Sequence, residues 1–169
     1  MTKKLVRYNR EPRPRRTYEH DFPKGEGGLV FCKICNAVYF KKSWHHSLRY
    51  HKKLREDLPV KFSLCPACVM IKSGTFEGRI LMKNVQADIR ENLLNLIHAF
   101  TYRAFKRDPM DRLIDAKSTR DGLEVTTTEN QLAVKLAKKI KDVYKKARMN
   151  VSYGHAKDKA SYITIEFIS

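Results

Sequence analysis

Four cysteines, arranged as two Cys-x-x-Cys pairs, are the residues of this chain whose spacing is most typical of a chemical site. Cys32 and Cys35 form the first pair, Cys65 and Cys68 form the second, and 29 residues separate the pairs. A Cys-x-x-Cys turn directs two sulfurs at one ion, and two such turns complete a tetrahedral zinc site with Zn–S distances of about 2.3 Å. Because four thiolates leave no open position for water or substrate, we predict one structural zinc ion.

Other interpretations explain the cysteines less well. Two disulfides are typical of small secreted chains, and no signal peptide is recognised here, while a redox centre needs only one pair. Ordinary buried thiols need no particular spacing. A two-cysteine, two-histidine finger built from Cys32, Cys35, His46 and His51 has ten residues in its middle gap. That finger usually has about twelve there, and it leaves the second cysteine pair unused.

The composition indicates an anionic partner. The chain has 169 residues, enough for one domain or two small ones, and 42% of them are hydrophobic. It carries 35 Lys and Arg residues against 18 Asp and Glu, a formal net charge of +17. This excess favours nucleic acid as the partner, and an anionic membrane surface second. No apolar run is long enough to span a bilayer, so we expect a cytoplasmic protein without a membrane partner.

Residues 1–28 are predicted to form a basic tail that is extended or disordered on its own. Three prolines oppose helix formation and the like charges repel one another. Arginine-rich arms with scattered aromatic residues bind RNA through phosphate pairing and base stacking, so we predict RNA contacts here, with a solvated terminus as the alternative. The predicted contacts are Arg7, Arg10, Arg13, Arg15 and Arg16.

Residues 29–83 are predicted to form a zinc-ribbon-like module with a basic insert. Alternating apolar and polar residues predict a strand, a metal-binding turn and a second strand over residues 29–40. Residues 41–55 have apolar positions at roughly helical spacing among many cations, which predicts a basic helix or loop. Trp44 either packs beside the metal, the role that we favour, or stacks on a base. The predicted RNA contacts of this insert are Lys41, Lys42, Trp44, Arg49, Lys52 and Lys53.

Residues 84–117 are predicted to be a linking helix region. An apolar stripe predicts a helix over residues 85–107, and a short amphipathic piece follows at residues 110–116. Asp108 and Pro109 end the predicted helix. This region has no pattern that indicates chemistry.

Residues 118–169 are predicted to form a β-α-β-β unit, which makes the chain an α+β protein. The helix of this unit is predicted to begin with a capping box, in which Thr128 is the N-cap and Gln131 reaches back. We expect one helix packed on a three-stranded sheet. Lysines on the outer face of the helix either bind phosphates or only keep it soluble, and Lys138 and Lys145 are the predicted contacts.

The cysteine region resembles a known family. A Cys-x-x-Cys followed by Cys65-Pro66-Ala67-Cys68, a polar turn and Gly78 looks like the amino-terminal zinc region of the large-ribosomal-subunit export adaptor (nonsense-mediated-decay-three) family and its small prokaryotic relatives. The segment 121–125 and the helix with Ala133 are similar to another segment of that family. The resemblance implies zinc ligation by the four cysteines and docking on a ribosomal surface. The second zinc ribbon, later domains and nuclear export signals of the larger members are not recognised, so it implies no export role.

The sequence fits three classes of function to different degrees. A zinc-stabilised RNA-binding protein that contacts ribosomal RNA or the large ribosomal subunit, mainly through phosphates, fits the charge and the resemblance best. A zinc-dependent DNA-binding transcriptional regulator is the alternative, with residues 41–55 entering a major groove. We expect no enzyme, because no paired carboxylates or nucleophile–base arrangement is recognised. A zinc ion with four thiolate ligands also has no open position for water or substrate.

Overall fold

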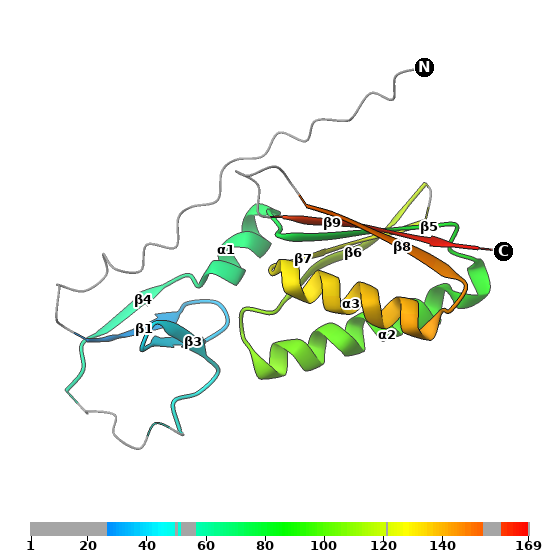
Figure 1. Ribbon diagram of the computed structural model, residues 1–169. Coiled ribbons are helices and arrows are strands. Elements are labelled where there is room, and N and C mark those ends of the chain that lie inside the picture. The colour runs from blue at the N-terminus through cyan, green and yellow to red at the C-terminus, as the bar shows by residue number, and fades with distance from the viewer. Residues whose placement is uncertain (1–26, 50, 52–56, 121, 154–159, 169) are drawn as a thin grey trace.

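The computed structural model describes residues 27–49, 51, 57–120, 122–153 and 160–168. These residues form two sheets and three helices, so the fold is mixed α+β as predicted. Figure 1 shows a small amino-terminal sheet with a short helix beside it, followed by a larger sheet that carries two longer helices. We refer to residues 27–76 as the cysteine module and to residues 77–168 as the plait.

The cysteine module is a four-stranded sheet followed by one short helix. Its elements are β1 (Leu29–Cys32), β2 (Val38–Phe40), β3 (Ser43–His45), β4 (Val60–Ser63) and α1 (Pro66–Ser73). The strand order is β3-β2-β1-β4, and β4 runs parallel to β1 at one edge. The core cluster around the cysteines has seven buried residues, and three of them are cysteines. Because so small an apolar core stabilises little by itself, we expect the module to depend on an ion held by its cysteines.

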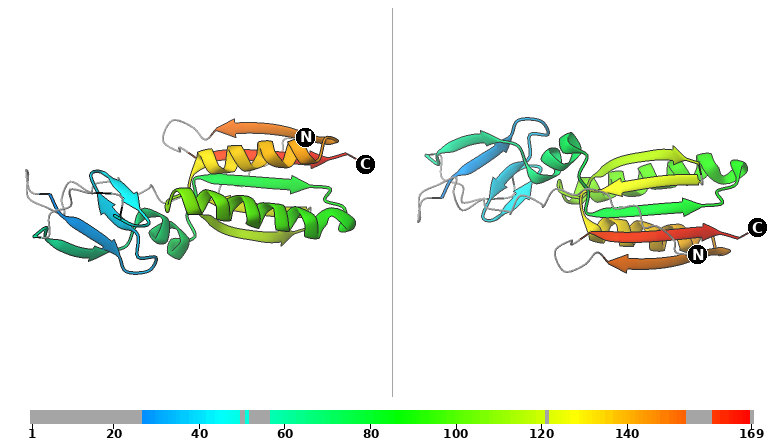
Figure 2. Two further views of the ribbon diagram at one scale, coloured as in Figure 1. Left: turned by 90° about the horizontal axis from the view of Figure 1, so that it is seen from below. Right: turned by 90° about the horizontal axis from the view of Figure 1, so that it is seen from above.

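The plait is a five-stranded sheet with both helices on one face (Figure 2). Its elements are β5 (Gly78–Lys83), α2 (Ala87–Arg107), β6 (Leu113–Thr119), β7 (Gly122–Thr127), α3 (Asn130–Val143), β8 (Ala147–Tyr153) and β9 (Ser161–Phe167). The order is β6-β7-β5-β9-β8, in which β5 and β9 are parallel and the other pairs are antiparallel.

Both helices of the plait are crossover connections between parallel strands. Helix α2 joins β5 to β6 and α3 joins β7 to β8, and these two connections run in opposite directions across the sheet. The starting strands β5 and β7 are themselves antiparallel. A right-handed crossover moves to the other face of a sheet when either the strand direction or the crossing direction is reversed. These two connections differ in both directions, so the two helices lie on the same face of the sheet. The opposite face carries no described helix.

The core of the plait lies between that sheet and its two helices. In β5 the alternate residues Ile80 and Met82 are fully buried, and Val125 and Ile163 lie beside Ile80 on the neighbouring strands. The buried stripes of α2 and α3 close this core; they comprise Leu93, Ile97, Leu132, Leu136 and Ile140. Alternation in the strands and helical spacing in α2 and α3 therefore place the apolar faces together.

The predicted three-stranded sheet is wrong in size, although its four elements are present as β7, α3, β8 and β9. Strand β5, which was predicted to belong to the zinc module, lies at the centre of the sheet, between β7 and β9. The amphipathic piece at residues 110–116 overlaps edge strand β6. The sequence pattern did not predict strand β6, because the strand is half-exposed and a bulge between Leu113 and Asp115 interrupts the alternation of apolar and polar residues.

The predicted capping box at Thr128 is also wrong. Helix α3 begins at Asn130 after the N-cap residue Glu129, which makes no side-chain cap hydrogen bond. Thr128 is 1% exposed, and its hydroxyl donates to the Met110 carbonyl and accepts from the Arg112 backbone N–H at 2.8 Å. Thr128 therefore ties the start of β6 to the start of α3, a long-range contact that outweighs the local capping preference.

An ion-paired carboxylate stabilises the open face of the sheet. Glu124 is 8% exposed, bonds to Arg79 Nε at 2.8 Å and lies 3.3 Å from Lys117 Nζ. Burial raises the pKa of Glu124, but the two cations outweigh it and hold the pKa below its usual value. A carboxyl with a lowered folded-state pKa stabilises the fold above its unfolded pKa of about 4.3, and this contribution is lost as the pH falls through the folded-state value.

We therefore expect Glu124→Gln to lower the free energy of unfolding by about 2 kcal/mol at pH 7. The difference from wild type should shrink as the pH falls below about 4 and through the lowered folded-state pKa of Glu124, because protonation then removes the charge that glutamine lacks. Urea denaturation of both proteins at a series of pH values measures this difference in the free energy of unfolding. Glu166→Gln, at an exposed position of β9, is the control. A difference that does not change with pH would contradict the ion-pair explanation.

Candidate metal centre

The first Cys-x-x-Cys pair lies in a tight turn after β1. Cys32 is the last residue of this strand, and its N–H donates to the Ala37 carbonyl at 2.8 Å. The Asn36 N–H donates to the Cys32 carbonyl at 3.0 Å, and Asn36 has a φ of 58°. Asparagine is one of the few residues that accept this left-handed conformation readily, so the sequence suits the turn.

The second pair lies at the start of α1. Cys65 is the N-cap residue, Pro66 occupies the first turn, and the Cys65 sulfur accepts from the Cys68 N–H at 3.4 Å. Proline suits this position because its missing N–H would have no helical partner. The parallel register of β1 and β4 pairs Cys32 with Ser63, which brings this turn beside the first one. As a result the Cys65 N–H donates to the Cys32 sulfur at 3.3 Å.

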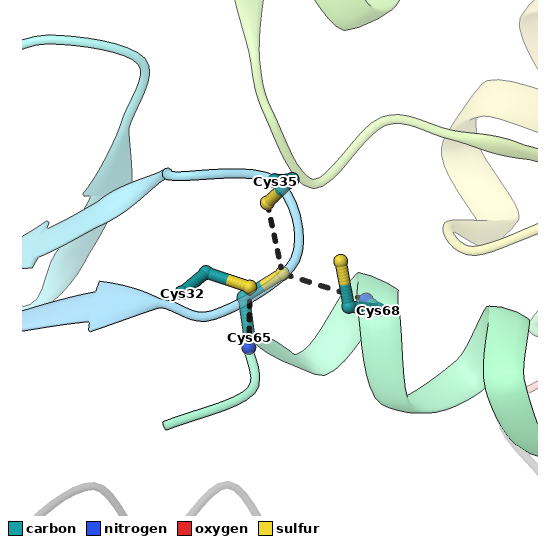
Figure 3. A group of neighbouring side chains, drawn as sticks. All are labelled: Cys32, Cys35, Cys65 and Cys68. Atoms are coloured by element: carbon teal, nitrogen blue, oxygen red, sulfur yellow. Dashed lines mark hydrogen bonds between the residues drawn. The ribbon is translucent and has the colours of Figure 1, made fainter. Parts of the chain in front are cut away.

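The four sulfurs converge on one point between the two turns (Figure 3). All four lie within 4.8 Å of one another, and the sulfurs of Cys35 and Cys65 are 3.6 Å apart. A disulfide needs about 2.05 Å, whereas the edge of a tetrahedron with metal–sulfur distances of about 2.3 Å is about 3.8 Å. All four thiols are free. The cluster therefore has the dimensions of a metal site and not those of two disulfides.

Burial makes the thiol cluster difficult to ionise without a cation. Cys65 is fully buried, which raises the pKa of its thiol, and the neighbouring Cys68 and Cys35 raise it further. Burial likewise raises the pKa of Cys68, to about 11. Burial also acts to raise the pKa of Cys32, but backbone N–H groups that donate hydrogen bonds to its sulfur lower this pKa to about 6. A divalent cation at the centre would keep all four groups as thiolates.

The histidines that a two-cysteine, two-histidine finger would need are engaged elsewhere. The His46 Nε2–H donates to the Phe105 carbonyl of α2 at 2.5 Å. His51 contacts the rings of Phe40 and His45, with centroids 5.2 and 5.0 Å away. Within the described residues, the four cysteines are the group that is close enough to hold a metal ion. The structure therefore favours the four-cysteine site over the finger.

Phe105 links the cysteine module to the plait. Its ring makes an edge contact with His46, with centroids 4.7 Å apart, and the Arg112 guanidinium lies 4.6 Å above the same ring. Met110, in the turn after α2, packs on the core that contains the cysteines. The cysteine cluster is therefore attached to the plait through packing at the end of α2.

The structure describes part of the predicted RNA-contact set. Exposed side chains at Lys41, Lys42, Arg49, Lys138 and Lys145 are open to a partner. Trp44 is only 7% exposed and its ring lies 5.4 Å from Tyr39, so its burial favours the packing role over base stacking. Outside the described residues lie Arg7, Arg10, Arg13, Arg15, Arg16, Lys52 and Lys53.

Two groups of surface residues were not predicted from the sequence. Arg103, Lys106 and Arg107 are exposed near the end of α2, which contacts the helix α3 that carries the predicted lysines. Phe62 in β4 is 64% exposed. The cations on α2 alternate with apolar core residues, a signal that was available in the sequence, whereas the exposure of Phe62 depends on its place at a sheet edge.

Comparisons with known proteins identify no family for this chain: no family model matches it, and a search of curated proteins finds no matching sequence. Among the described residues, no helix combines the length and the apolar character that crossing a bilayer requires.

Proposed function

We propose that this protein is a zinc-stabilised RNA-binding protein. The observation that carries the proposal is the charge on the helical face of the plait. Lysines at six positions, all exposed, lie on α3 and the turn that follows it, namely Lys135, Lys138, Lys139, Lys141, Lys145 and Lys146. The exposed cations at the end of α2 extend this surface, because α2 and α3 are in contact.

Zinc is the ion that best suits the cluster. Four sulfur ligands in a tetrahedral arrangement are typical of structural zinc, and the N–H···S hydrogen bonds orient the thiolates. A site with four protein ligands has no position for water, so the ion would stabilise the cysteine module and take no part in a reaction.

Ribosomal RNA of the large subunit is the proposed target. The resemblance of the cysteine region to the large-ribosomal-subunit export adaptor family supports this target, and so does the net charge of +17. A helical face of lysines and arginines binds phosphates with little base readout, so affinity should come mainly from neutralising the RNA backbone.

RNA affinity is expected to fall steeply with salt. If about six phosphates of a helical RNA are contacted, the slope of log K against log[salt] is about −5, and affinity falls about 1,000-fold between 50 and 200 mM salt. Fluorescence anisotropy with a fragment of large-subunit ribosomal RNA measures this slope. A slope near zero would refute binding through phosphates.

The lysines of α3 can be tested in the same assay. Replacing Lys135, Lys138 and Lys139 with glutamine should reduce the slope by about 3, because each lysine that contacts a phosphate contributes about 1. Lys72→Gln on the exposed end of α1 is the control and should leave the slope unchanged.

A DNA-binding regulator has less support in the structure. That hypothesis requires residues 41–55 to enter a major groove, but residues 43–45 form strand β3 and the other described residues of this segment are not helical. Competition between duplex DNA and structured RNA for the labelled complex distinguishes the two partners. Effective competition by RNA alone is the expected result.

A further inference from the structure

The two faces of the four-stranded sheet differ in what they pack against, and one of them is open at its β4 edge. The register pairs Val30 with Tyr39 and Tyr39 with Trp44, and this face packs on the cysteine core. On the opposite face, the register places Phe31 beside Val38 and Phe62. Alternation along β2 adds Phe40, and pairing with Val38 adds His45. We call Phe31, Phe40, His45 and Phe62 the aromatic face.

Phe62 is the most accessible member of the aromatic face. Phe62 is 64% exposed, and all residues of β4 are exposed to a large degree. Strand β4 lies at the edge of the sheet, next to β1 (Figure 1). The Phe31 ring lies next to it, with centroids 5.9 Å apart and planes tilted by 34°. Val60 in the same strand is 49% exposed. An exposed aromatic ring that is supported from the side by a second ring presents a flat surface to a ligand.

The charge around the aromatic face selects the kind of ligand. Described residues 27–49, 51 and 57–76 include six Lys or Arg residues and one acidic residue, Asp57. Lys33 follows β1 two residues after Phe31 and is exposed. Lys41 Nζ lies 5.4 Å from the centre of the Phe40 ring. Rings flanked by cations bind the bases and phosphates of a single strand, whereas lysines are depleted from the centres of protein interfaces.

We propose that the aromatic face binds unpaired RNA, with a base stacked on Phe62 and phosphates paired with neighbouring lysines. This inference rests on the proposed RNA-binding function. It assigns the binding of single-stranded RNA to the cysteine module. The lysines of α3 then bind backbone phosphates of any RNA, while Phe62 distinguishes unpaired from paired nucleotides. A duplex keeps its bases stacked on each other, so it gains nothing from the exposed ring.

The test compares full-length, zinc-loaded proteins on two RNA probes. One probe is an unpaired strand of about 12 nucleotides, and the other is the duplex of that strand with its complement. Phe62→Ala should weaken binding of the unpaired probe by about 5- to 100-fold and leave duplex binding within about 2-fold. The salt slope should not change, because no charge is removed. Tyr153→Ala removes a 70% exposed ring from β8 and is the matched control.

A second variant keeps the test decisive if Phe62→Ala alters folding. Phe62→Trp should retain affinity for the unpaired probe, and its exposed indole should be quenched when a base stacks on it. The native Trp44 is 7% exposed and provides the unquenched reference. Unchanged affinity in Phe62→Ala, equal losses on both probes, or no quenching in Phe62→Trp would overturn the inference. If wild-type protein binds only the duplex, this inference fails and RNA binding stands; if it binds neither probe, both fail.

Discussion

Cys65→Ser is expected to unfold the cysteine module and to reduce bound zinc from one ion per chain to none. The Cys65 sulfur is fully buried, and it lies between Cys35 and the Cys68 N–H. Structural zinc sites contribute about 10–16 kcal/mol of apparent binding free energy, far more than a seven-residue core can replace. Removal of zinc from the wild-type protein with a chelator should have the same effect, because the folding of such a module is coupled to metal binding.

The plait should remain folded in the same variant. Its core cluster contains 14 buried residues, none of which belongs to the cysteine cluster. Hydrogen exchange should therefore show protected amides in β5 to β9 and unprotected amides in β1 to β4. Loss of all protection would mean instead that the contacts of His46 with Phe105 and of Met110 with the cysteine core make the two parts one cooperative unit.

His51→Asn provides the matched control for metal binding. His51 contacts two aromatic rings in the structure and lies outside the cysteine cluster, so we expect this variant to keep its zinc. Elemental analysis of the two purified variants gives a clear comparison. Retention of zinc in Cys65→Ser together with its loss in His51→Asn would reverse our assignment and support the two-cysteine, two-histidine finger.

The cysteine cluster could be predicted from the sequence because its chemistry is local. Each pair lies within one turn, and Cys-x-x-Cys spacing is sufficient to indicate a metal-binding turn. The structure adds what brings the turns together, namely the parallel pairing of β1 with β4 across a long insert. Parallel pairing over such a distance leaves no short-range pattern in the sequence.

The assembly of the plait could not be predicted in the same way. Helix α2 was predicted within two residues because its apolar stripe is long, and β7, α3 and β9 were recognised for similar reasons. Strand β5 follows the second cysteine pair closely in sequence, and therefore it was placed in the wrong unit. Its position between β7 and β9 depends on two pairings at long range, which periodicity does not report.

Gly78→Ala is expected to lower the free energy of unfolding of the plait by about 3 kcal/mol or more. A Cβ at this first residue of β5 would lie 2.3 Å from the Ala133 Cβ of α3 and 2.5 Å from Thr127 Oγ1. These neighbours are buried and cannot move independently, because Ala133 is fixed on a helix and the Thr127 hydroxyl donates to the Glu129 carbonyl at 2.8 Å. The helix must shift away from the sheet, which opens the core.

Gly74→Ala separates this packing effect from the loss of backbone freedom. Gly74 has a φ of 69°, but nothing lies within 4 Å of an added Cβ, so only the strain of a left-handed residue remains, about 1 kcal/mol. Gly78 has no such φ, so its larger expected effect comes from the close approach of α3 to β5 alone. Thermal or urea denaturation of both variants measures the difference. Equal losses would show that the helix can move without opening the core, and that Gly78 is not required for this packing.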